Sequence, residues 1–274
     1  MTRNEELKIL HDEELKILMH LKMIFEKYNI RYYMLGGTFL GAIRHKGFIP
    51  WDDDIDIGIP RNDYELFIKK CREELDKEYK LITLKDEESK YNYLCKIESS
   101  RVKLYDDGCR IAKTYGAWID IFPLDGMPNN LLLRKIHTFN LLRHRAYWKL
   151  TENCGNVAIN SNHRTKFESL IIKLGLKFNI GKIFSKSKEI NKINNLLKKY
   201  DYDESKYIVN FMGAYKMKEM FERKIFDDAD MYKFENTELP APKNFDFYLT
   251  QLYGDYLTPP KKEERNPHNT HLKK

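Results

Sequence analysis

The sequence predicts a mixed α/β (α+β) fold, in which a mixed sheet is flanked by helices and followed by a mostly helical lobe. Three observations lead to this prediction. Amphipathic helical periodicity runs over residues 5–28, short apolar or alternating runs typical of strands recur through residues 31–122, and helical composition dominates after Pro128. We therefore divide the chain into a core at residues 1–128 and a mostly helical lobe at residues 129–274.

Length and composition are those of a folded globular protein. The 274 residues suffice to bury a sizeable core, and 42% of them are hydrophobic and 13% aromatic. The formal net charge of +7 suits an enzyme that attracts an anionic donor or works near an anionic membrane surface. The absence of an RNA-binding signature and of zinc-finger spacing predicts that nucleic acid is not a partner.

Cysteine usage and the N-terminus predict a cytoplasmic protein. The four cysteines include no C-x-x-C pair, which argues against a structural zinc site and against a disulfide framework. The first ten residues, MTRNEELKIL, carry acids where a signal peptide needs a positive start, and no run approaches the roughly 18 apolar residues of a membrane span. We expect no transmembrane segment. Peripheral contact with the inner face of the cell membrane stays open.

Each element follows from local patterning. Residues 5–28 carry apolar side chains at helical spacing, and a capping-box pattern at Asn62 predicts another helix start. Thr38 is the expected cap of a short helix that runs to Arg44. Strands are predicted at residues 31–35, 54–59, 80–84, 91–97, 102–105, 118–122 and 208–211, and further helices at residues 131–150, 166–178, 188–199 and 246–253.

The chemistry points to the acidic strand at residues 54–59. Side chains two apart on a strand share a face, so Asp54 and Asp56 project together while Ile55 and Ile57 face the core. Two adjacent carboxylates repel one another unless a cation lies between them or one keeps its proton, and oxygen ligands favour Mg²⁺ or Mn²⁺. A solvated acidic loop is the alternative, although such a loop does not need buried isoleucines between its acids.

An EF-hand calcium loop is excluded. A loop that begins at Asp52 would place Ile57 where the motif requires glycine and Asp63 where it requires glutamate.

A glycine turn precedes the acidic strand. Gly36 and Gly37 follow a predicted strand and open a helix, an arrangement that leaves backbone N–H groups free to bind an anion. A glycine pair alone is usually only a turn. Joined to Asp-x-Asp downstream, it is the pattern of the nucleotidyltransferase superfamily, although the gap between Gly37 and Asp54 is longer than usual there.

The segment GGTFLGAIRHKGFIPWDDDIDIGIPRNDYELF, residues 36–67, resembles the LicD family. The resemblance continues through WIDIFPLDG at residues 118–126 and, more loosely, through LYGDYLTPPKKEER at residues 252–265. It implies a nucleotidyltransferase-like fold and the transfer of phosphocholine from CDP-choline to a glycan. It also implies that the C-terminal tail returns toward the active site.

The nucleotidyltransferase-like fold implies a third carboxylate beside Asp54 and Asp56, and we expect these acids to hold Mg²⁺ or Mn²⁺. Asp120 fits that place because Ile119 and Ile121 flank it on a predicted strand. Asp125 is the competing candidate, but it follows Pro123 in an expected turn.

The remaining candidates would bind the donor. We expect the glycine turn to contact the donor phosphates through its backbone. Basic residues nearby and in the tail should supply positive charge to the same phosphates. For Lys96, the alternative is that its side chain extends to water. If the donated alcohol is choline, an aromatic face should meet its ammonium group. The phosphate candidates are Gly36, Gly37, Thr38, Arg44, His45, Lys46, Lys96, Arg265 and His268, and the choline candidates are Trp51 and Trp118.

Three hypotheses of function follow. The leading one is a metal-dependent transferase that passes a phospho-alcohol group from a CDP-alcohol, CDP-choline first, to a sugar hydroxyl of a glycan or lipid-linked glycan and releases CMP. The second is a nucleotidyltransferase that transfers NMP from an NTP and releases pyrophosphate. The third is a metal-dependent module that binds a glycan or nucleotide without turnover.

Overall fold

The computed structural model describes residues 2–84, 86, 95–106, 113–151, 183–261, 265 and 270–272. The predicted helix at residues 166–178 and the candidate His268 lie outside these residues. Cys71 and Cys95 are both buried and free.

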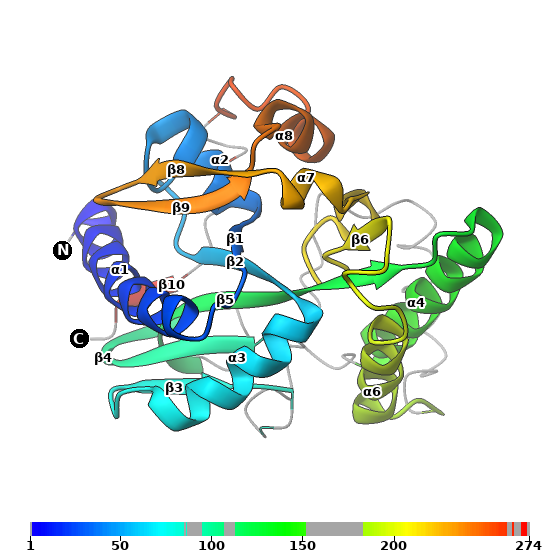
Figure 1. Ribbon diagram of the computed structural model, residues 1–274. Coiled ribbons are helices and arrows are strands. Elements are labelled where there is room, and N and C mark those ends of the chain that lie inside the picture. The colour runs from blue at the N-terminus through cyan, green and yellow to red at the C-terminus, as the bar shows by residue number, and fades with distance from the viewer. Residues whose placement is uncertain are drawn as a thin grey trace.

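The centre of the molecule is a mixed sheet, which has eight strands within the described residues (Figure 1). Its main path runs β1 (Tyr33–Met34), β2 (Ile55–Pro60), β5 (Lys113–Met127), β4 (Cys95–Asp106) and β10 (Thr270–Leu272). Off this path, β3 (Tyr79–Ile82) pairs with β4, and β6 (Tyr207–Val209) joins β5 to β7 (Met220–Glu222). Strands β2 and β5 are parallel, whereas the other pairs are antiparallel.

Three isoleucines allow strand β2 to lie inside the sheet, between β1 and β5. Ile55, Ile57 and Ile59 are completely buried, as expected for a strand with a parallel neighbour and covered faces. Helices α1 (Arg3–Lys27) and α3 (Arg61–Glu74) pack against the sheet and against each other. The predicted alternation at residues 54–59 is confirmed, with the strand beginning one residue later.

Helix α1 covers the sheet with one apolar stripe that includes Leu10, Ile17, Leu18 and Leu21. It begins earlier than predicted because Thr2 and Glu5 form a capping box at its first turn. No described helix has the length and apolarity that a membrane span requires.

Two predicted caps are wrong. Helix α2 (Gly36–His45) has Leu35 as its N-cap, and the hydroxyl of Thr38 instead accepts a hydrogen bond from the backbone N–H of Asp56 at 2.8 Å. Helix α3 begins directly after Pro60 without a side-chain cap. The Asn62 amide donates to Asp201 in the second half of the chain.

The second half of the chain contributes helices and a hairpin. Helices α4 (Leu131–Thr151) and α6 (Lys186–Leu197) pack together at the right of Figure 1, over a separate core that includes Leu141, Trp148 and Ile193. The hairpin β8 (Ala229–Phe234) and β9 (Thr237–Pro242) lies beside α2, as does α8 (Phe245–Tyr253). The remaining elements of this half are η3 (Lys216–Glu219) and α7 (Lys224–Asp227).

The predicted mixed sheet flanked by helices is confirmed. The domain boundary at residue 128 stays a prediction, and strands β6 and β10 from the second half join the main sheet.

Candidate active site

Three carboxylates predicted to act together meet at the centre of the sheet. Asp56 on β2 stands opposite Asp120 on β5 in the parallel register, and Asp54 lies directly before β2. One carboxylate oxygen from each of the three lies within 4.8 Å of the others. Asp120 is buried, whereas Asp54 and Asp56 are half-buried.

The electrostatics of this group favour a bound cation. Burial, together with the charges of Asp54 and Asp120, raises the pKa of Asp56 well above its usual range. The buried Oδ1 atom of Asp120 accepts no hydrogen bond from the described residues, although the Lys96 ammonium lies 3.1 Å away. Three carboxylate oxygens this close together are the donor set that a hard divalent ion such as Mg²⁺ prefers.

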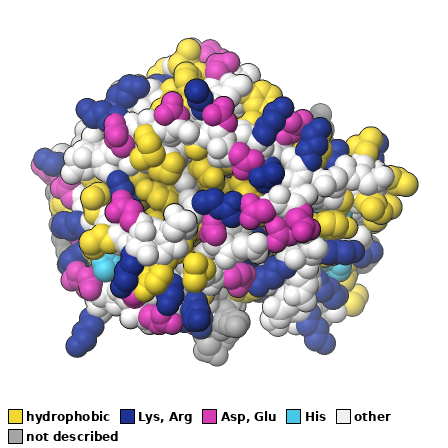
Figure 2. All heavy atoms as spheres, viewed as in Figure 1, with side chains coloured by type: hydrophobic (Ala, Val, Ile, Leu, Met, Phe, Trp, Pro, Cys, Tyr) yellow, Lys and Arg dark blue, Asp and Glu magenta, His cyan; other side chains and the backbone are white. Residues whose placement is uncertain are grey.

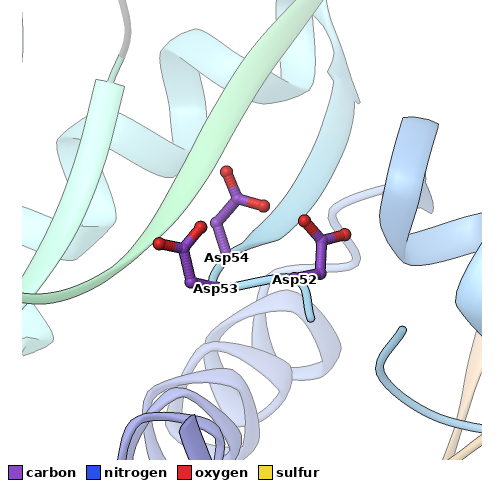
Figure 3. Close-up of side chains that lie close together, drawn as sticks. All are labelled: Asp52, Asp53 and Asp54. Atoms are coloured by element: carbon purple, nitrogen blue, oxygen red, sulfur yellow. The ribbon is translucent and has the colours of Figure 1, made fainter. Parts of the chain in front are cut away.

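Asp52 and Asp53 extend the acidic group toward α1. Figure 3 shows Asp52, Asp53 and Asp54 rising from one short stretch of chain, and their carboxylate oxygens also lie within 4.8 Å of one another. Asp53 is buried, with the Arg3 guanidinium 3.8 Å away. The backbone carbonyl of Asp52 lies 2.8 Å from Nε2 of His11 on α1. The sequence interpretation considered Asp52 only as the start of the excluded calcium loop and assigned no role to Asp53.

Glu14 on α1 is a sixth acidic residue near this group, and the sequence interpretation missed it. Its side chain is completely buried, and neither carboxylate oxygen has a hydrogen-bond partner among the described residues. Burial, followed by the charges of Asp54 and Asp53, raises the pKa of Glu14 well above its usual range. A signal was present in the sequence, because Glu14 lies within the apolar stripe formed by Leu10 and Ile17.

The glycines at the start of α2 allow two of the carboxylates to come close. A Cβ on Gly37 would lie 2.7 Å from Oδ2 of Asp52, and one on Gly36 would lie 3.1 Å from Oδ2 of Asp56. Gly36 also has a positive φ of 48°, which strains residues that carry a side chain. The backbone N–H of Gly36 donates to the hydroxyl of Tyr248 on α8.

Lys96 and Trp118 fix the position of Asp120. Lys96 on β4 is directly opposite Asp120, and its ammonium also lies 4.5 Å from the ring centroid of Trp118. The Trp118 indole N–H donates to Oδ2 of Asp120 at 3.1 Å. The ammonium of Lys96 is therefore directed into the site, rather than out to water as in the alternative interpretation.

Asp125, the competing candidate for the third carboxylate, has a different role. It lies within β5, not in the predicted turn, and its two oxygens accept hydrogen bonds of 2.6 and 2.8 Å from Arg61 of α3. Both side chains are buried. This bidentate pair joins α3 to the sheet, which leaves Asp120 as the carboxylate beside Asp56.

A family model described as LicD/FKTN/FKRP, nucleotidyltransferase domain, matches residues 29–154. The lipopolysaccharide cholinephosphotransferase LicD of Haemophilus influenzae is 30% identical over 258 residues, which cover 93% of this chain and 92% of that protein. The chain belongs to the LicD family. Mouse ribitol 5-phosphate transferase FKRP is 50% identical over 36 residues, 13% of this chain and 7% of that protein.

The segment matched by the LicD family model contains Asp54, Asp56 and Asp120. Glu14 and the tail lie outside it. The comparison with the Haemophilus influenzae LicD, in contrast, extends over nearly the whole of both chains.

A second group of candidates gathers around Trp51. The Arg265 guanidinium from the tail lies 3.8 Å from the centroid of the Trp51 ring, and that of Arg44 lies 5.9 Å away. His45 meets the same ring edge-on. Burial, reinforced by Arg44, lowers the pKa of His45 below its usual value of 6.5, so the imidazole is neutral at pH 7.

The two remaining candidates are Lys46, which lies apart from both groups, and Trp118, which lies beside Asp120. Lys46 is exposed, with a positive φ of 62° at the C-terminus of α2, so it ends the helix. Trp118, a candidate choline contact, is only 5% exposed, and its ring already meets the ammonium of Lys96. Trp51 is more accessible than Trp118.

Proposed function

We propose that the chain is a Mg²⁺- or Mn²⁺-dependent transferase. It passes a phospho-alcohol group, phosphocholine from CDP-choline, to a sugar hydroxyl of a cell-surface glycan or its precursor and releases CMP. The observation that carries this proposal is the meeting of Asp54, Asp56 and Asp120 in a chain that aligns along nearly its whole length with a cholinephosphotransferase.

Asp54, Asp56 and Asp120 would hold the divalent ion. When bound, such an ion neutralises the charge of a diphosphate and stabilises the attacking and leaving oxygens of a phosphoryl transfer. The raised pKa of Asp56 supports this assignment, because a cation removes the repulsion that makes its ionisation unfavourable.

The protein's own residues position the third carboxylate and accept the proton. Trp118 and Lys96 hold Asp120 from two sides. Asp120 would accept the proton of the sugar hydroxyl as that oxygen bonds to the phosphorus attached to the alcohol. The bond from this phosphorus to the bridging oxygen of the diphosphate breaks, and the bridging oxygen leaves with CMP.

The donor would lie between the acidic group and the residues around Trp51. Arg44 and Arg265 supply positive charge to its phosphates. These two cation–π contacts support Trp51 as a choline contact, and the choline ammonium would take the place that the Arg265 guanidinium occupies on the ring. The first turn of α2, with Gly36 and Gly37, adds the positive end of a helix dipole.

Product analysis tests the proposal. The purified protein, incubated with Mn²⁺, CDP-choline and a glycan acceptor, should release CMP and transfer phosphocholine. Release of pyrophosphate from an NTP would identify the second hypothesis instead, a nucleotidyltransferase. Binding without turnover of either donor would identify a binding module. A thermal-shift comparison of CDP-choline, CDP-ethanolamine, CDP-ribitol and NTPs should then rank the donors, because a ligand of the folded state raises Tm.

A further inference from the structure

Helix α4 is apolar on two opposite faces. One face carries Leu141 and Trp148, which are buried in the core shared with α6. The opposite face carries a stripe of large apolar side chains that remain exposed, and we call it the outer face of α4. Its members are Leu132, Ile136 and Phe139, and the exposed Leu131, Leu133 and Leu142 lie at its two edges. A helix that is apolar all round is normally covered on both sides.

The residues of this outer face are strongly exposed. Leu132 and Phe139 are 66% and 64% exposed, and no residue of the face or its edges is less than 37% exposed. Leu132, Ile136 and Phe139 follow one another at spacings of four and three residues, so they form one continuous ridge. Contiguous exposed apolar ridges of this kind mark interaction sites.

The charge on α4 has one sign. The helix contains five basic residues, Arg134, Lys135, Arg143, Arg145 and Lys149, and no Asp or Glu. Lys135 and Arg143 are exposed beside the ridge, and the Arg143 guanidinium lies 5.9 Å from the centroid of the Phe139 ring. Figure 2 shows hydrophobic side chains, interspersed with Lys and Arg, at the right-hand end of the molecule, where α4 lies.

We propose that the outer face of α4 docks the protein on an anionic lipid surface. The ridge would enter the boundary between headgroups and acyl chains, and the flanking Lys135 and Arg143 would meet the negative headgroups. Pairing with a second copy of the same face is disfavoured, because two helices without acids would bring like charges together. The proposal is independent of the chemistry at the aspartates.

Co-sedimentation with vesicles tests this proposal on the full-length protein. We expect binding to vesicles of phosphatidylcholine with phosphatidylglycerol and much weaker binding to phosphatidylcholine alone. The double substitution Leu132→Ser with Phe139→Ser should reduce binding to the anionic vesicles at least tenfold. The pair Lys135→Gln and Arg143→Gln should reduce it by about fivefold for each charge removed, and more at low salt.

Matched controls change equally exposed residues elsewhere. Met23→Ser with Leu257→Ser removes apolar side chains that are 59% and 63% exposed, and Lys8→Gln with Lys233→Gln removes two charges from exposed side chains. Both control proteins should bind vesicles like the unaltered protein.

Four results would overturn the proposal. The first is that the unaltered protein does not bind anionic vesicles, and the second is that the Leu132→Ser, Phe139→Ser variant binds them equally well. The third is a clear loss of Tm in that variant. The fourth is a dimer of the unaltered protein that the two substitutions convert to a monomer. A loss of Tm would mean that the chain itself covers the outer face, and a dimer would mean that a second copy does.

Discussion

Asp56 and Asp120 stand directly opposite each other on two parallel strands, β2 and β5. Their separation is therefore set by the backbone hydrogen bonds of the sheet, and a contact between the side chains is not needed to bring them together. The hydroxyl of Thr38 accepts a hydrogen bond from the backbone N–H of Asp56, and Lys96 and Trp118 contact Asp120. Two repelling carboxylates are thus held in place before any ligand arrives.

Removal of either acid on the β2 side should abolish activity while leaving the fold intact. We expect Asp54→Asn or Asp56→Asn to lower kcat by about three orders of magnitude, because charge stabilisation by a bound ion is worth several kcal/mol. In metal-free buffer at pH 8, Asp56→Asn should also raise Tm, since it relieves the repulsion that raises the pKa of Asp56. The exposed Asp230→Asn serves as the control. Near-normal turnover by Asp54→Asn would refute the metal assignment.

Substitution of Asp120 should affect activity, whereas substitution of Asp125 should affect stability. Asp120→Asn should lose turnover with little change in Tm, whereas Asp125→Asn should lower the free energy of unfolding by about 3 kcal/mol because it leaves the buried Arg61 without its carboxylate. Urea unfolding and initial rates on both variants check this. A stable, inactive Asp125→Asn together with an active Asp120→Asn would reverse the assignment.

The neighbouring acids Glu14 and Glu13 should show opposite effects on stability. The folded protein holds the Glu14 proton at pH values where the unfolded chain has released it. The contribution of Glu14 to the free energy of unfolding therefore falls as pH rises above about 4.5. Glu14→Gln should therefore raise Tm at pH 8 in metal-free buffer, by more than at pH 5.

Glu13 provides the matched comparison. Burial alone would raise its pKa, but hydrogen bonds from Ser99 and Arg101 lower it below the usual range. The stabilisation that Glu13 gives the folded state is present at neutral pH and is lost as the solution becomes acidic. Glu13→Gln should lower the free energy of unfolding at pH 8 by about 1–3 kcal/mol. A fall in Tm for both variants would show that Glu14 is stabilised by contacts of another kind.

Divalent ions should stabilise the protein more at higher pH. Mn²⁺ at about 100 times its Kd should add ~2.7 kcal/mol to the free energy of unfolding. The gain should be smaller at pH 5.5 than at pH 8, because Asp56 must lose its proton before it binds the ion. Differential scanning calorimetry with Mn²⁺ or EDTA measures this. An equal gain in Asp56→Asn would place the ion elsewhere.

The residues around Trp51 should affect donor binding more than the chemical step. Arg265→Gln removes a guanidinium that lies 3.8 Å from the centroid of the Trp51 ring, and it should raise the KM for CDP-choline about tenfold with a smaller change in kcat. Lys261→Gln, an exposed substitution in the same tail, is the control. An unchanged KM for Arg265→Gln would remove the tail from the donor site.

The sequence alone predicted much of the local structure and the three carboxylates that the structure brings together. Alternating isoleucines identified β2, and helical periodicity identified α1. Asp120 became a candidate because the family resemblance implied a third carboxylate and because Ile119 and Ile121 flank it. These features follow from periodicity and side-chain chemistry, which are local properties of a chain. The same local rules placed the caps of α2 and α3 wrongly, because Thr38 and Asn62 find partners far away in the sequence.

Tertiary structure decided which side chains share a charge environment. The parallel pairing of β2 with β5 brought Asp120 to Asp56, and the packing of α1 placed Glu14 near the same acidic group. Only the folded structure shows that Arg61 forms an ion pair with Asp125 and that the ammonium of Lys96 lies beside Asp120. Electrostatic interactions depend on distance in space and on burial, and neither can be read from the spacing of residues along the chain.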